Sequence, residues 1–160
     1  MARSQCSGLD EITAINQEAG KLKAQGINII VALGHSGYKK DKEIAKNCPE
    51  VDVVVGGHSN SFLYSPVNSP PSNEQPVGPY PTWITQSNGK VVPVVQAYAY
   101  TKYLGFLKLI FDDNGVLIQD RTKGNPILLD HNKPQGDRIL KNPSVLVYLC
   151  IIFFLQIHQF

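Results

Sequence analysis

Two stretches of the sequence have the same form: NIIVALGHSG at residues 28–37 and VDVVVGGHSN at residues 51–60. In each, a run of aliphatic and β-branched residues ends at glycine, and a histidine follows, His35 in one and His58 in the other. Such runs are typical of strands that are buried on both faces of a parallel sheet. Neighbouring strands would bring both imidazoles to one sheet edge, about 4.8 Å apart. That spacing is close enough for a shared metal centre.

The segments around these stretches predict an α/β fold. Residues 10–25 have apolar side chains at helical spacing, with Asp10 placed to cap the start and Gly26 placed to end the helix. Residues 38–47 predict a second, polar helix. A β-α-β order implies a right-handed crossover, so the two strands point the same way. Ligands of open α/β sheets bind at the carboxyl ends of such strands.

The second half of the chain predicts antiparallel strands. Residues 61–81 hold six of the eleven prolines and predict a long irregular loop beside the histidines. Strands are expected at residues 83–86, 91–100, 106–111 and 116–119, with a hairpin turn at residues 112–115. Pro93 indicates an edge strand or a bulge, and the chain after Gly124 is expected to be coil. The predicted fold class is therefore α/β, a β-α-β unit followed by antiparallel strands.

Composition narrows the classes of protein. The chain has 160 residues, a net charge of +2 and 18% charged residues, which argues against nucleic-acid binding. Its three cysteines have no metal-type spacing, and Cys48 is expected to be a packing residue. No secretory signal peptide is visible. The apolar run at residues 145–155 is too short to span a membrane, so it is a buried strand, a buried helix or a segment of other origin.

The polar residues of the two turns each have a functional and a structural interpretation. His35 and His58 are metal ligands, or they are turn histidines bonded to nearby carbonyls. Asn60 contacts a phosphate or a water near the metal, or it forms an Asx-turn. Serines in the turns favour a stabilising role, because no base stands at motif spacing. Asp41, the one carboxylate near either histidine in sequence, is placed on the helix that follows.

Three segments carry a resemblance to a known family: IIVALGHSGYKKDKEIAKNCPEVDVVVGGHSNSFLY (residues 29–64), VPVVQAYAYTKYLGFLKLIFDDNGVLI (residues 92–118) and GNPILLD (residues 124–130). They resemble the second half of the calcineurin-like metallophosphoesterase domain of animal ecto-5′-nucleotidases and related apyrases. The resemblance implies a layered α/β/β/α domain, of which residues 10–141 would be the C-terminal half. Residues 1–9 would be a segment outside the family, and residues 142–160 an apolar tail of uncertain origin.

The resemblance also implies a site. In the family the histidines of GHSG and GGHSN are ligands of a two-metal, commonly zinc, centre, and these match His35 and His58. The asparagine that matches Asn60 lies close to the substrate phosphate. The implied partner is a nucleotide, and the implied location is extracellular or at the cell surface. Family members are often homodimeric through a domain with no counterpart here.

Several family motifs have no match before these segments: the Asp-x-His motif, a bridging Asp in a Gly-Asp segment and the Asn-His-Glu motif. We therefore expect a fragment of a metal-dependent 5′-nucleotidase that is inactive or poorly active alone and assign no catalytic residue. The alternatives are a fragment of an apyrase that hydrolyses ATP and ADP, or a non-catalytic module. If the strands that come earlier in the family's domain are missing, the sheet has an unpaired edge, and we expect the chain to be poorly soluble.

Overall fold

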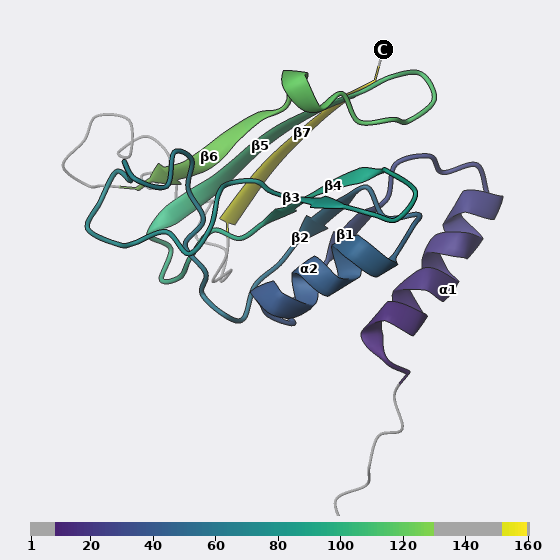
Figure 1. Ribbon diagram of the computed structural model, residues 1–160, viewed down its shortest axis with the longest axis horizontal. Helices are drawn as coiled ribbons and strands as arrows, with labels where there is room; N and C mark the ends of the chain where they lie inside the picture. The colour runs from purple at the N-terminus through teal and green to yellow at the C-terminus, as the bar shows by residue number, and fades with distance from the viewer. Residues whose placement is uncertain (1–8, 130–151, 160) are drawn as a thin grey trace, which may run out of the picture.

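The strands that precede the two histidines are neighbours in a mixed four-stranded sheet (Figure 1). The computed structural model describes residues 9–129 and the backbone of residues 152–159. In it, β1 (Val31–Leu33) and β2 (Val53–Val55) pair in parallel, β2 pairs in parallel with β4 (Val91–Val95), and β4 pairs antiparallel with β3 (Thr82–Thr85). The strand order is β1-β2-β4-β3, so the predicted parallel β-α-β unit is confirmed.

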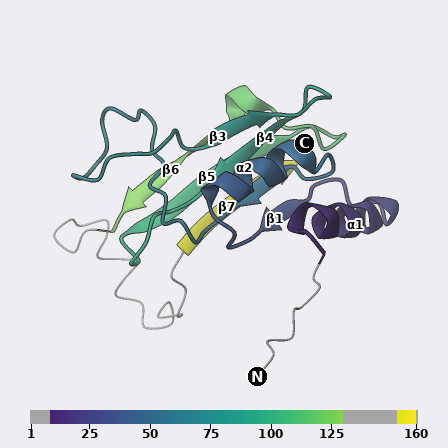
Figure 2. The same ribbon diagram turned by 60° about the horizontal axis from the view of Figure 1, so that its bottom comes forward.

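Two helices cover one face of this sheet (Figures 1 and 2). The first, α1 (Glu11–Ala24), begins where the Thr13 N–H donates to the Asp10 carboxylate at 3.4 Å, and Gly26 follows its end with φ +86°. The second, α2 (Tyr38–Asn47), has the predicted bounds. It connects β1 to β2 and therefore follows directly on the turn that holds His35.

A second sheet packs on the other face. It contains β5 (Tyr103–Phe111) between β6 (Lys123–Leu128), which runs antiparallel, and β7 (Ile152–Gln159), which runs parallel. A 3-10 turn, η1 (Gln119–Arg121), leads into β6. The described architecture is thus α/β, with two helices, a mixed four-stranded sheet and an antiparallel β5–β6 pair.

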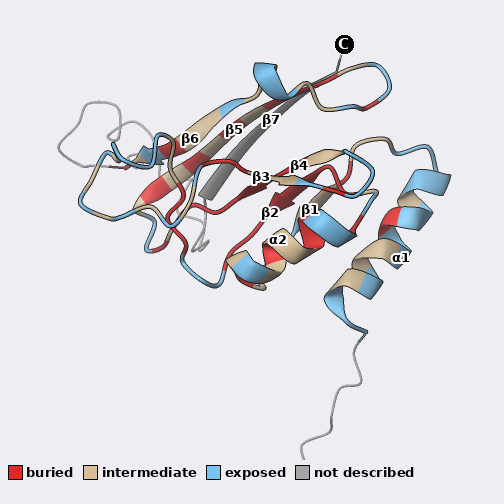
Figure 3. Cartoon of the chain, viewed as in Figure 1, coloured by how far each residue is buried: buried red, intermediate tan, exposed pale blue. Residues whose placement is uncertain are grey.

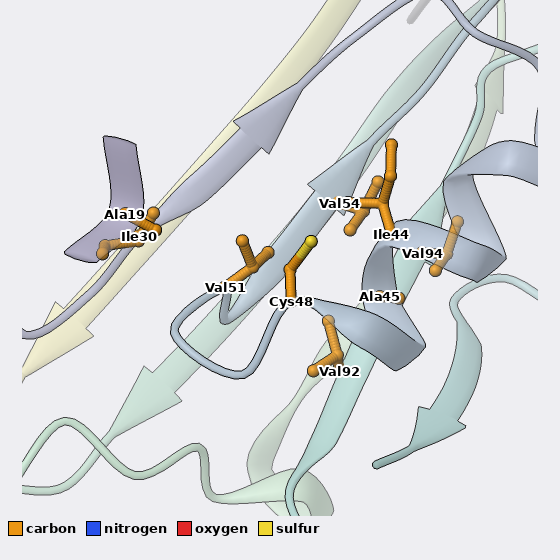
Figure 4. Close-up of a cluster of buried hydrophobic side chains, with 9 residues drawn as sticks. All are labelled: Ala19, Ile30, Ile44, Ala45, Cys48, Val51, Val54, Val92 and Val94. Atoms are coloured by element: carbon orange, nitrogen blue, oxygen red, sulfur yellow. The ribbon is translucent and has the colours of Figure 1, made fainter. Parts of the chain in front are cut away.

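Alternation along the strands gives the protein two apolar layers. Figure 3 shows buried residues along β2, β4 and β5. Val54 of β2 faces the helices, with Ile44, Ala45 and Cys48, in the cluster drawn in Figure 4. Val53 and Val55 point to the opposite face, where they join residues of the second sheet in a cluster completed by Leu63, Tyr80, Val95, Leu107, Leu109 and Phe111. Burial on both faces explains the continuous valine run of β2. Cys48 is fully buried and packs as predicted.

Four expectations about the strands are wrong. The strand predicted over residues 116–119 is reduced to one bridge, between Leu117 and Phe111, and Gln119 begins the 3-10 turn η1 instead. β6 occupies residues 123–128, where coil was expected, because its ladder with β5 outweighs a sequence with glycine, asparagine and proline. The strand predicted over residues 91–100 ends at Val95, and Tyr98, Tyr100 and Thr101 have positive φ. β4 is also an interior strand despite Pro93. Its pairing with β2 begins only at Val94, after the proline.

The ends of the chain are described in part. Residues 152–159 form the strand β7, which includes the last four residues of the apolar run at 145–155. The rest of that run lies outside the described residues, and the predicted burial is not tested. The predicted boundaries near residues 9 and 141 are not tested, and residues 1–8 and 130–151 lie outside the described part. In the part that the structure describes, no helix is both long and apolar enough to cross a membrane.

Candidate metal-binding site

The carboxyl ends of three parallel strands lie in line and set the positions of the two histidine turns. Leu33 is paired with Val55, and the ladder continues for one step when the Gly34 N–H donates to the Val55 carbonyl at 3.0 Å. The Gly56 N–H in turn donates to the Val95 carbonyl at 2.9 Å. The chain leaves the sheet at these glycines, so His35 and His58 emerge at the same edge.

The two imidazoles meet at this edge. Their ring centroids are 5.4 Å apart and the ring planes make an angle of 75°. Both residues are exposed. Neither imidazole hydrogen-bonds to another described residue, so the alternative of turn histidines tied to nearby carbonyls has no support in this part of the chain.

The arrangement of the rings is compatible with one shared ion. Two imidazoles bound through nitrogen at about 2.0–2.1 Å to a tetrahedral ion have centroids roughly 5 Å apart. The observed 5.4 Å matches that separation. The ligand set is incomplete, however, because no group of three or more His, Cys, Asp or Glu side chains suited to a metal occurs among residues 9–129.

The backbone of the second turn is held in an unusual conformation. His58 has φ +71° and Asn60 has φ +49°, a left-handed conformation that is uncommon for residues with a Cβ, although histidine and asparagine adopt it more often than most. Both residues are exposed, on either side of Ser59. Asn60 therefore stands on the same exposed turn as His58, as the sequence interpretation requires for a substrate contact.

Asp41 lies behind the site rather than in it. Its side chain is 1% exposed and packs against Gly56, where a Cβ would stand 1.9 Å from Asp41 Oδ2. Burial raises the pKa of the Asp41 carboxyl, while a hydrogen bond from Gln96 and the charge of His35 oppose that rise. Asp41 Oδ1 has no hydrogen-bond partner among the described residues. The helix position was predicted, but the burial was not.

Sequence reasoning missed Gln96. This residue is 1% exposed, follows β4 directly and bonds to Asp41, Gly57, Ser59 and Ser61. The sequence predicted a strand that continued to Tyr100, and a glutamine inside a strand gives no indication of a functional role. The available signal was that VVPVVQ ends a third valine run in the same manner as the two histidine turns.

The serine of the second turn, Ser59, has the structural role that the sequence favoured. Ser59 Oγ accepts from the Tyr38 N–H at 2.9 Å and lies 2.8 Å from Ser61 Oγ. The hydroxyl thereby binds the first N–H of α2. No described base contacts it, so a nucleophilic role for Ser59 has no support from the geometry.

Comparison with known proteins gives a consistent set of relatives. No protein-family model matches the chain. The chain is 54% identical to human 5′-nucleotidase over 130 residues, which cover 81% of this chain and 22% of the relative. It is 49% identical to a snake venom 5′-nucleotidase of Macrovipera lebetinus over 82% of this chain and 31% of the relative.

A solved structure gives the same result. The crystal structure of a 5′-nucleotidase precursor from Thermus thermophilus superimposes with a TM-score of 0.68 at 39% identity. The match covers 75% of this chain and 23% of that chain. The chain thus spans less than a third of the length of each of these three proteins.

Proposed function

The chain belongs to the 5′-nucleotidase family, with a match to 22% of the human relative, and on this premise we propose that it carries part of a metal-dependent nucleotidase site. His35 and His58 supply two imidazole ligands to a divalent ion, with zinc the preferred candidate. Asn60 contacts the phosphate of a nucleoside 5′-monophosphate. The proposed setting is a layered α/β/β/α metallophosphoesterase domain outside the cell or at its surface.

The observation that carries this proposal is the contact between the two imidazoles at one sheet edge. A bound divalent ion would polarise a phosphoryl oxygen and lower the pKa of a bound water. The chain's own contribution is to hold two neutral nitrogens in place on rigid strands. The 39% identical solved 5′-nucleotidase precursor supports the same fold for this part of the chain.

The described residues do not provide a complete catalytic set. Two metal ions need at least eight coordination positions and anionic ligands to offset their charge, and residues 9–129 bring together no cluster of three candidate ligands. We therefore propose that the 160-residue chain binds a divalent ion weakly and does not hydrolyse nucleoside 5′-monophosphates efficiently.

The test combines metal binding with activity on the 160-residue chain. Zinc affinity is measured by competition with a chelating dye for the wild type, His35→Ala, His58→Ala and, as an exposed control on α2, Lys39→Ala. Each histidine variant should lose binding while the control keeps it. Equal affinity in all four proteins would refute the shared site. Turnover of AMP near that of a full-length relative, lost in His35→Ala, would refute the proposed lack of efficient activity.

A further inference from the structure

The Gln96 side chain is buried beneath the turn at residues 57–61. Its Nε2 donates to Asp41 Oδ2 at 2.5 Å and to the Gly57 carbonyl at 2.9 Å. Its Oε1 accepts from the Ser61 N–H at 3.1 Å and from the Ser59 hydroxyl at 3.2 Å. A glutamine amide has two donor hydrogens and two acceptor lone pairs, so every hydrogen-bonding position of this amide has a partner. A buried network that is fully satisfied holds its members in one arrangement.

These bonds alternate along the turn. Gln96 holds residues 57, 59 and 61, whereas the exposed residues between them are His58 and Asn60. Both intervening residues have positive φ, +71° and +49°, a conformation that is unfavourable for side chains with a Cβ. The Gln96 amide restrains the turn in this shape from the end of β4 through its bonds to residues 57, 59 and 61.

The same network reaches the helix that follows His35. Ser59 Oγ binds the N–H of Tyr38, the first residue of α2. Gln96 itself binds Asp41, one helical turn further along α2. Both contacts connect the His58 turn to α2. Because α2 begins where the His35 turn ends, these contacts also set the position of that turn.

From this arrangement we infer that Gln96 is a positioning residue, which fixes the turn presenting His58 and Asn60 and aligns it with the His35 turn. The inference deepens the proposed metal-binding function and rests on it. Gln96 acts through the backbone of residues 57–61 and through Asp41, without contact to the metal or the substrate.

Gln86 offers a matched control. It is another buried glutamine, 5% exposed, and its Nε2 donates to two backbone carbonyls, those of Ala45 and Cys48, at 2.8 and 2.9 Å. These carbonyls lie at the far end of α2. Gln96→Leu and Gln86→Leu therefore remove comparable buried amides, and both should lower the melting temperature. Only Gln96, however, lies beneath the turn that holds His58.

The experiment compares wild type, Gln96→Leu and Gln86→Leu in the 160-residue chain with two measurements. In the metal-free protein, the nuclear Overhauser contact between the His35 and His58 rings should disappear in Gln96→Leu alone. With zinc added, the dissociation constant should rise about 10–100-fold in Gln96→Leu, the usual effect of losing a residue that orients a ligand, and remain unchanged in Gln86→Leu. Retained ring contact in Gln96→Leu would overturn the inference, and so would equal zinc affinities in the two variants when wild type binds zinc.

The metal-free measurement separates the two proposals. If wild type shows the ring contact but binds no zinc, the proposed function fails, and loss of the contact in Gln96→Leu still confirms the role of Gln96. A second pair, Ser59→Ala and Ser87→Ala, covers the case in which Gln96→Leu does not fold, because both serines are exposed. Ser59→Ala should weaken the ring contact and Ser87→Ala should not. Identical spectra of the imidazoles in this pair would contradict the inference.

Discussion

Gly34 and Gly56, the glycines at which the two histidine turns begin, differ in whether they can be replaced by a larger residue. A Cβ at Gly56 would lie 1.9 Å from Asp41 Oδ2 and 2.4 Å from its Cγ, whereas a Cβ at Gly34 meets nothing within 4 Å. The Asp41 carboxylate is buried and bonded to Gln96, so an added methyl would displace the carboxylate from this hydrogen bond. The glycine at residue 56 is therefore required for packing, and the one at residue 34 is not.

Gly56→Ala should destabilise the protein by about 1–3 kcal/mol, the usual cost of forcing an added methyl into a packed interior. Gly34→Ala is the matched control and should stay within about 0.5 kcal/mol of wild type. Urea denaturation followed by circular dichroism measures both. Equal stabilities of the two variants would contradict the close contact between Gly56 and Asp41.

Glu74 gives the long loop at residues 61–81 a dependence on pH. A hydrogen bond from Lys102, joined by one from Ser72, lowers the pKa of the Glu74 carboxyl to about 2, against an ordinary value of 4.5. The folded state thus favours the carboxylate. Its contribution is complete above the unfolded-state value and is lost as the pH falls toward about 2.

Glu74→Gln should lower the free energy of unfolding by up to about 1 kcal/mol at pH 7, since the pair lies near the surface. The difference from wild type should shrink when the same denaturation is repeated at pH 3. Glu18→Gln, which alters an ion pair on the exposed face of α1, is the control at both pH values. If the loss of stability caused by Glu74→Gln were larger at pH 3 than at pH 7, the predicted direction of the pH dependence would be wrong.

At the scale of secondary-structure elements, a buried carboxylate joins the start of β1 to β2. Asp52 is 4% exposed, accepts from the Ile30 N–H at 2.8 Å and pairs with the Lys90 ammonium at 2.7 Å. The Asp52 N–H also donates to the Ile30 carbonyl at 2.8 Å. The side chain thus extends the β1–β2 ladder by one residue on the side opposite the histidines.

Asp52→Ala should cost about 3 kcal/mol, because it leaves the Ile30 N–H unsatisfied and the partly buried Lys90 without its carboxylate. Glu18→Ala, which removes an exposed partner of Lys21, should change stability by less than about 0.5 kcal/mol. Thermal and urea unfolding of both variants measure the contrast. A cost for Asp52→Ala as small as that of the control would mean that the ladder does not depend on this carboxylate.

At the scale of the whole molecule, the four-stranded sheet has an open edge at β1 within residues 9–129. Leu33, at the carboxyl end of β1, is 81% exposed. Unpaired edges with exposed apolar side chains favour pairing between copies of a chain. Leu33→Lys should therefore reduce self-association in sedimentation velocity, whereas Val116→Lys, 61% exposed in a turn, should not. Identical distributions for both variants would exclude β1 as the contact.

The sequence alone was sufficient where local pattern and tertiary structure agree. The valine runs, the helix bounds at residues 38–47 and the meeting of His35 with His58 follow from periodicity and from the direction of parallel strands. It was insufficient where long-range pairing decides. β6 forms because β5 provides a ladder. Gln96 lies directly after β4, which ends five residues before the predicted strand does, and its burial depends on contacts with Asp41 and the turn at residues 57–61 that are distant in sequence.

The pairing of β1 with β2 also determines which mutations would keep His35 and His58 next to each other. Successive side chains of a strand face opposite ways, so a shift of one residue exchanges the two faces of the strand. Replacing Val54 by isoleucine would leave the direction of the imidazole that follows β2 intact. Deleting one codon from that valine run would turn His58 away from His35 without altering either histidine, so the length of this strand matters more to the pair than the identity of its aliphatic side chains.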